Sequence, residues 1–124
     1  MTFNLTTVGH IRCLRWLHNK SPDLIVGILT SKALKGYKKE ITPFKERFEI
    51  MRVFSESIGF KLVSQNSLDP SYNIKKYRPD YIASGDGWEK VELEAVKKYR
   101  IKTMVIPLAK RHSSSDIIKK IKKC

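Results

Sequence analysis

Residues Asp23–Leu29 read D-L-I-V-G-I-L, a continuous apolar run of the length of a strand. A strand with one wet face alternates apolar and polar residues, whereas a continuous run is typical of a parallel strand covered on both faces of its sheet. The sequence therefore predicts a buried parallel strand at this position.

Helical and strand patterns alternate on both sides of this run. Before it, Ile11, Leu14 and Leu17 recur at helical spacing. After it, a long helix is expected to open at Pro43 and to carry an apolar stripe into the core. Further strands are predicted over residues 60–65, 80–84 and 102–108, with helices over residues 73–77 and 89–99. This alternation predicts an α/β fold with a parallel sheet.

Two segments have a different character. Thr30–Thr42 is polar and rich in lysine, and we expect a mobile loop there. Ser113 and Asp116 resemble a capping box that opens a final basic helix. We see no repeat and no linker, so residues 1–124 are predicted to form a single domain.

The balance of charge favours anionic partners. The chain has 25 Lys and Arg against 12 Asp and Glu, a formal charge of +13. Such a field attracts nucleotides, nucleic acids or anionic membranes, although it can also serve solubility alone. Cys13 and Cys124 have no metal-knuckle or redox spacing, and we see no leader or membrane span. We therefore expect a cytoplasmic protein that does not contact membranes.

Several motifs follow one another in a fixed order. Thr2–His10 reads T-F-N-L-T-T-V-G-H and runs directly into the first expected helix. Four further motifs are L-K-G-Y-K-K at 34–39, P-F-K-E-R at 43–47, G-D-G-W at 85–88 and H-S-S-S at 112–115. Together they resemble the nucleotidyltransferase superfamily with the signature G-x-F-[DN]-x-x-[HT]-x-G-H. Within it they resemble the cytidylyltransferase family, in particular the glycerol-3-phosphate cytidylyltransferases.

This resemblance implies a fold and a reaction. The fold is a Rossmann-like three-layer sandwich around a parallel sheet. The reaction is transfer of CMP from CTP to a phosphorylated alcohol such as glycerol 3-phosphate, with release of pyrophosphate. Mg²⁺ would accompany the triphosphate, and we expect no metal-binding residues in the protein itself.

The resemblance also implies roles for individual residues. His10, Thr7 and Lys38 would be catalytic, with His10 stabilising the charge that grows on the α-phosphate. The nucleotide-binding residues would be Phe3, Gly9, Lys35, Arg47, Gly85, Asp86, Trp88, Ser113 and Ser114. Plainer roles stay open for some of them: a surface ion pair for Arg47, a core position for Trp88, helix capping for the two serines and a solvated loop for the two lysines.

The match departs from the family at several positions. Thr7 replaces the first histidine, as it does in the adenylyltransferases that make dephospho-coenzyme A. Leu108 stands where an arginine usually follows the proline, and Ser55–Ile58 replaces the family's R-Y-V-D segment. Because that segment is associated with dimer contacts, a homodimer is an open expectation.

The largest departure concerns the first strand. Met1 occupies the place of the signature's first glycine, so the central strand that precedes it in the family is missing. Its neighbours would be left roughly 10 Å apart, about two strand spacings, with backbone groups unpaired. We hypothesise that the natural product carries this strand upstream, or that activity is lost without it.

Other functions stay open at this point. An adenylyltransferase, similar to an FAD synthase or a sugar-phosphate adenylyltransferase, is the alternative in the same class, although the tryptophan of G-D-G-W favours a cytidylyltransferase. A catalytically impaired relative that binds a nucleotide is the alternative in another class. Nucleic acid is the less favoured partner.

Overall fold

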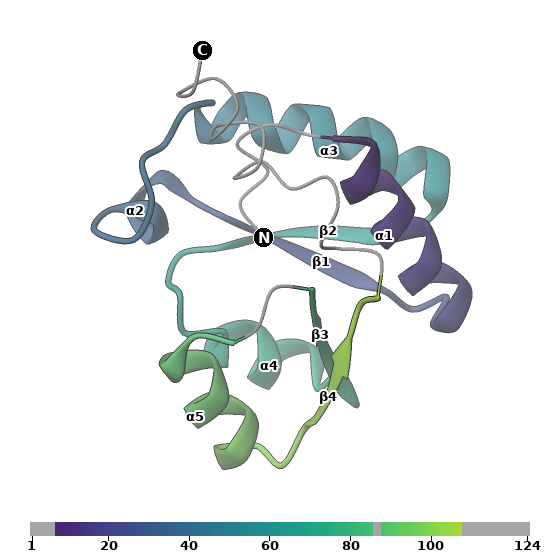
Figure 1. The fold of residues 1–124 in the computed structure, drawn as a ribbon. Coiled ribbons are helices and arrows are strands. Elements are labelled where there is room, and N and C mark those ends of the chain that lie inside the picture. The colour runs from purple at the N-terminus through teal and green to yellow at the C-terminus, as the bar shows by residue number, and fades with distance from the viewer. Residues whose placement is uncertain (1–6, 86–87, 108–124) are drawn as a thin grey trace.

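The computed structural model describes residues 7–85 and 88–107 (Figure 1). In chain order the elements are α1 (Val8–Lys20), β1 (Ile25–Leu29), α2 (Ser31–Leu34), α3 (Phe44–Ile58), β2 (Lys61–Gln65), α4 (Ser71–Tyr77), β3 (Tyr81–Ser84), α5 (Lys90–Lys98) and β4 (Lys102–Val105). The predicted alternation of strands and helices is confirmed.

The strands of this part of the chain pair as two parallel ribbons. β1 pairs with β2 from Ile25↔Lys61 to Leu29↔Gln65, and β3 pairs with β4 from Tyr81↔Lys102 to Ser84↔Val105. Between residues 7 and 107, outside the gap at 86–87, no strand joins the two pairs. The expectation of a parallel, Rossmann-like α/β arrangement interrupted at its centre is therefore confirmed over this range.

Helix α1 packs against both strand pairs. Leu14 is fully buried with residues of β1 and α3, namely Val26, Ile28 and Met51. One residue earlier in the helix, Cys13 packs with Leu17 and with Ile106 after β4, and Ala83 and Met104 lie against this group. Figure 1 shows α1 and α3 together on one side of β1 and β2, with α4 and α5 on the other side. Adjacent residues of α1, Cys13 and Leu14, thus pack against different strand pairs.

The predicted apolar stripe of α3 lies in the core. Met51 is 0% exposed, and Phe44, Phe48, Phe54 and Ile58 pack around the same cluster. Pro43 is the N-cap, one residue before the position predicted for it. The helix ends at Gly59, whose φ of +103° lies in the left-handed region that favours glycine.

Three expectations on secondary structure need comment. Residues 31–34, expected as loop, form α2, because Thr30 caps the turn through Ala33 N–H to Oγ1 (3.3 Å) and the apolar pair Ala33 and Leu34 is buried beside Leu29. The strand predicted over 102–108 ends at Val105. The helix expected after Ser113 lies outside the described residues.

None of the helices in residues 7–85 and 88–107 has both the length and the apolar character needed to cross a bilayer.

Candidate functional site

The start of α1 is organised by two residues of the signature. Thr7 is the N-cap, with φ −118° and ψ 167°, and its Oγ1 accepts the His10 backbone N–H at 3.4 Å. In return, the Thr7 backbone N–H donates to His10 Nδ1 at 3.0 Å. This reciprocal capping box fixes the imidazole by contacts only three residues apart.

These contacts define which nitrogen of His10 carries the proton. Nδ1 accepts a hydrogen bond from an amide N–H, so in the neutral ring its lone pair is in use and the proton lies on Nε2. The first turn of α1 has no acidic residue to offset the positive end of the helix dipole, and Gly9 in that turn is buried. The turn therefore combines a donor nitrogen with a field that favours an anion.

The lysine-rich loop follows α2 and has a defined backbone. Gly36 adopts φ +81°, and the amides of Tyr37 and Lys38 both donate to Leu34 O, at 2.9 and 3.1 Å. Lys35 and Lys38 are exposed, and Lys38 Nζ lies 5.4 Å from the centre of the Tyr37 ring. The loop thus presents two ammonium groups to solvent from an ordered turn.

Arg47 is buried under this loop. It is 1% exposed, and its Nη1 donates to Leu29 O at 2.6 Å. Its Nε donates to Thr42 O at 2.7 Å, and its Nη2 lies 2.7 Å from Glu40 Oε2 in an ion pair. The sequence left open an ion pair at the surface as the plainer role of Arg47. The structure shows an ion pair, but the guanidinium in it is buried. Its role as a nucleotide ligand stays a prediction.

Glu40 is the residue that the sequence analysis missed. The Ser31 hydroxyl donates to its carboxylate, and this bond, with the Arg47 hydrogen bond and charge, outweighs desolvation and holds the pKa of Glu40 below its usual 4.5. The carboxylate is therefore ionised at neutral pH. Its sequence signal was available, because Glu40 is the one acidic residue among four lysines between residues 30 and 42.

The loop after β3 contributes two described residues of the G-D-G-W motif. Gly85 directly follows β3, and Trp88 precedes α5; both are half-buried. They lie at the carboxyl end of a parallel strand, where open α/β sheets bind ligands. The other predicted residues Phe3, Asp86, Ser113 and Ser114 lie outside the described residues, so their roles stay predictions.

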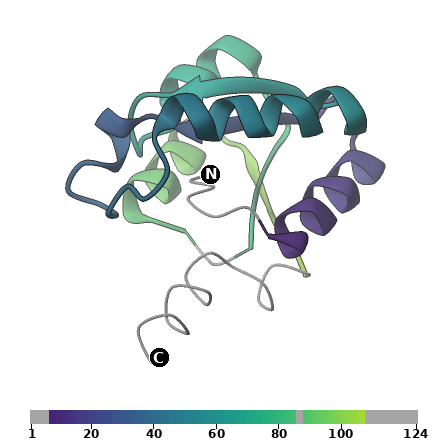
Figure 2. The same ribbon diagram turned by 90° about the horizontal axis from the view of Figure 1, so that it is seen from above.

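The predicted residues fall into separate groups. Figures 1 and 2 both show the loop after α2 apart from the N-terminal end of α1. Within residues 7–85 and 88–107, no three His, Cys, Asp or Glu side chains gather as a metal site. The described geometry therefore supports two anion-attracting units, one at His10 and one at the lysine loop.

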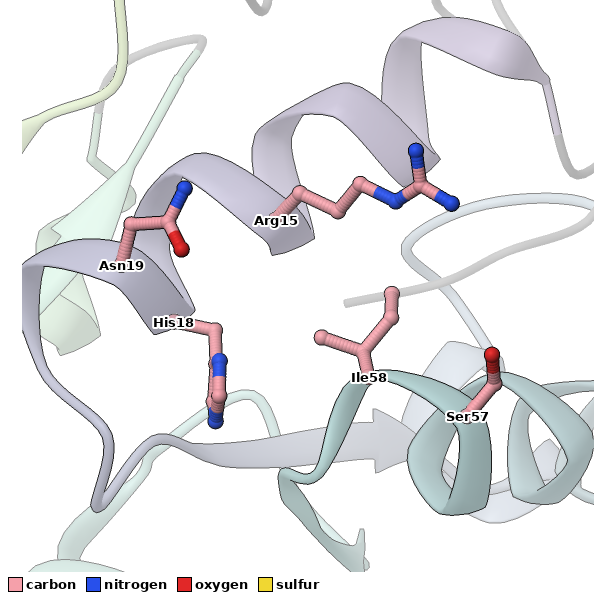
Figure 3. Close-up of a pocket in the computed structure, with 5 residues that line it drawn as sticks. All are labelled: Arg15, His18, Asn19, Ser57 and Ile58. Carbon is pink, nitrogen blue, oxygen red and sulfur yellow. The ribbon is translucent and has the colours of Figure 1, made fainter.

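Two hollows lie elsewhere on the molecule. One of about 210 Å³ is formed where Arg15 and His18 of α1 reach toward Ser57 and Ile58 of α3, with Asn19 at its edge (Figure 3). The other, of about 390 Å³, lies between the end of β2 and α4. Neither is lined by a residue that the sequence analysis assigned to the site.

Comparison with known proteins agrees with the motifs. The family described as cytidylyltransferase-like matches residues 2–120. The "Bifunctional protein HldE" of Methylobacillus flagellatus is 26% identical over 125 residues, which cover 96% of this chain and 25% of that protein. The chain thus spans about a quarter of the length of this relative.

Proposed function

Because the chain belongs to the cytidylyltransferase-like family, we propose that it is a nucleotidyltransferase that moves a nucleoside monophosphate from a triphosphate to a phosphorylated alcohol. The observation that carries this proposal is the Thr7–His10 box at the start of α1. We propose CTP as the donor, because Trp88 in the G-D-G-W motif resembles the glycerol-3-phosphate cytidylyltransferases. The proposed acceptor is glycerol 3-phosphate or a similar phospho-alcohol.

His10 acts as a hydrogen-bond donor in this proposal. The acceptor oxygen attacks the α-phosphorus, the bond to the bridging oxygen of pyrophosphate breaks, and negative charge grows on the non-bridging oxygens. Nε2–H donates to one of these oxygens while Thr7 holds Nδ1. The dipole of α1 acts in the same direction.

The lysines act on the leaving group. Lys35 and Lys38 neutralise the triphosphate and then the departing pyrophosphate as mobile point charges. Mg²⁺ would be held mainly by phosphate oxygens, since this ion keeps several water ligands and needs few protein ligands when a polyphosphate is present. It supplies further charge neutralisation when bound.

The second candidate is transfer of AMP from ATP. Thr7 is the observation that favours it, because the adenylyltransferases that make dephospho-coenzyme A also have threonine at that position. The chemistry assigned to His10 is the same, so only the base specificity differs. A relative that binds nucleotides without turnover is the remaining alternative.

The first experiment measures pyrophosphate release with CTP, ATP, GTP and UTP, each offered with glycerol 3-phosphate and a panel of phospho-alcohols. Release with CTP supports the main proposal, and release with ATP supports the second. Nucleotide binding without release from any pair identifies the impaired relative.

The role of His10 is tested by three substitutions at that position. His10→Ala should lower kcat by a factor of about 10² to 10³, and because it removes the acceptor of the Thr7 amide it should cost no more stability than the loss of a helix cap, about 1 kcal/mol. His10→Gln, whose amide nitrogen can reach the place of Nε2, should retain more activity than His10→Asn, whose nitrogen lies at the place of Nδ1.

His18→Ala is the matched control, since His18 lies in the same helix and lines the hollow between α1 and α3, away from the start of α1. Equal activity of the wild type and His10→Ala would remove His10 from the mechanism.

A further inference from the structure

The segment between β1 and α3 is closed around one guanidinium. Arg47 bonds to the last residue of β1 through Leu29 O and to the end of the segment through Thr42 O. Glu40 accepts from the remaining nitrogen of the guanidinium, Arg47 Nη2, at 2.7 Å. The start of the segment, its end and Glu40 near that end are thereby tied to the same buried group.

The lysines lie between these attachment points. Lys35 and Lys38 occupy the turn after α2, and Glu40 follows two residues later. Because Lys38 and Glu40 share a short stretch of backbone, the place where Glu40 is held limits where the Lys38 ammonium can reach. Tyr37 adds a second restraint, since it packs on the cluster of Leu29, Ala33 and Leu34.

The charged groups of the segment fall into a buried ion pair and a set of exposed lysines. Arg47 is buried, and its partner Glu40 has a side chain that is 29% exposed. The single carboxylate of the segment balances the guanidinium, and the exposed lysines carry the net positive charge of the loop. A buried arginine in an ion pair with all three of its nitrogens bonded is suited to hold a backbone in place.

We propose that Glu40 and Arg47 are positioning residues that hold the lysine loop as a binding unit for the pyrophosphate part of a nucleotide. This inference rests on the proposed function and assigns Arg47 an indirect role, through the loop, in place of direct contact with the nucleotide. The order of the loop lowers the entropy that the lysines lose when they bind a polyphosphate.

The first measurement needs no activity. Hydrogen exchange at the amides of Tyr37 and Lys38, which both donate to Leu34 O, reports the order of the turn. Exchange should become roughly tenfold faster in Glu40→Ala and in Arg47→Lys. Lysine keeps the positive charge but lacks the planar guanidinium with its several N–H donors. Glu46→Ala is the matched control, because Glu46 is an exposed acidic residue of the first turn of α3 and should leave exchange unchanged.

The second measurement is binding of pyrophosphate by calorimetry. Glu40→Ala should weaken binding roughly tenfold, and the same substitution should have little further effect once Lys35 and Lys38 are both alanine. In turnover with the accepted triphosphate, Glu40→Ala should raise KM more than it lowers kcat. Glu40→Gln, which keeps the shape and one acceptor oxygen, should fall between Glu40→Ala and the wild type.

The outcomes separate this inference from the proposed function. If the wild type binds pyrophosphate and Glu40→Ala weakens it while no triphosphate is turned over, the positioning role stands and the proposed function fails. If the wild type does not bind pyrophosphate, or if Glu40→Ala behaves as Glu46→Ala does, the positioning role is wrong. Faster exchange with unchanged binding also overturns it, since the network would then serve stability alone.

Discussion

Thr7 is the residue on which the geometry at the start of α1 depends. Its Oγ1 accepts the His10 amide, one of the first-turn amides that have no partner within the helix itself. Thr7→Ala should lower the free energy of unfolding by about 1 kcal/mol, and Thr7→Ser should restore most of it because serine caps at least as well. Chemical denaturation of the three proteins measures this. A Thr7→Ala variant as stable as the wild type would mean that the long 3.4 Å contact contributes nothing.

Glu40 gives the stability a defined dependence on pH. Its pKa in the folded protein lies below 4.5 because of the Ser31 hydrogen bond and the Arg47 ion pair. The unfolded chain therefore takes up the proton more readily, and the contribution of Glu40 is complete above pH 4.5 and is lost as the pH falls below that value.

The measurement compares wild type with Glu40→Gln across pH. The difference in Tm should be constant between neutrality and mild acid and should shrink on further acidification, since glutamine does not titrate. A difference that grows on acidification would contradict the direction of the pKa shift.

For single residues, the sequence predicts contacts between residues close in the chain and misses contacts between residues far apart in it. The Thr7–His10 box joins residues three apart, so a motif of ten residues contains it. The burial of Arg47 depends on Leu29, which is 18 residues away, and no spacing along the chain encodes that contact. The role expected for Arg47 was therefore the part of the site with the weakest sequence support.

Among the elements, α3 offers a test of backbone conformation at its end. Gly59 has φ +103°, and a Cβ there would lie 3.3 Å from His18 Nε2 of α1. Gly36 also has a positive φ, +81°, but no atom lies within 4 Å of its Cβ position. Gly36→Ala should therefore cost about 1 to 2 kcal/mol through strain alone, and Gly59→Ala should cost more because the His18 side chain must also shift.

Thermal unfolding of both variants gives the comparison. An equal loss would show that His18 yields freely to the added methyl group. A larger loss for Gly36→Ala would contradict the steric contact expected between His18 and a methyl group at position 59.

The elements themselves were largely predictable because their apolar patterns are strong. The run at 23–29 and the stripe of α3 each bury a whole face, and both were found within two residues of their bounds. Helix α2 was missed because four residues are too few for a period to show. Its existence depends on the Thr30 cap and on burial of Ala33 and Leu34, of which only the first is visible in the sequence.

At the scale of the whole molecule, the described residues form two strand pairs of unequal burial that both pack on α1. In β1, Val26, Ile28 and Leu29 are buried, whereas β3 and β4 bury no residue fully. The interruption between the pairs was predicted from the motifs. The difference in burial was not, because the strands of both pairs have similar apolar content. The homodimer also stays a prediction.

This difference in burial predicts that local unfolding of β3 and β4 costs less free energy than local unfolding of β1 and β2. Lys61 and Lys102 form a matched pair of probes: each is the exposed first residue of its strand and donates its amide to the partner side, to Leu24 O at 3.0 Å and to Asp80 O at 3.2 Å. Because opening β3 and β4 exposes less apolar surface, the Lys102 amide should exchange at least about tenfold faster than the Lys61 amide after correction for intrinsic rates. Thr30 and Ile106, which donate across the other ends of the same pairs, should show the same order. Equal protection at all four amides would mean instead that the contacts of Cys13 and Leu17 bind β4 so firmly to α1 that both pairs unfold as a single cooperative unit.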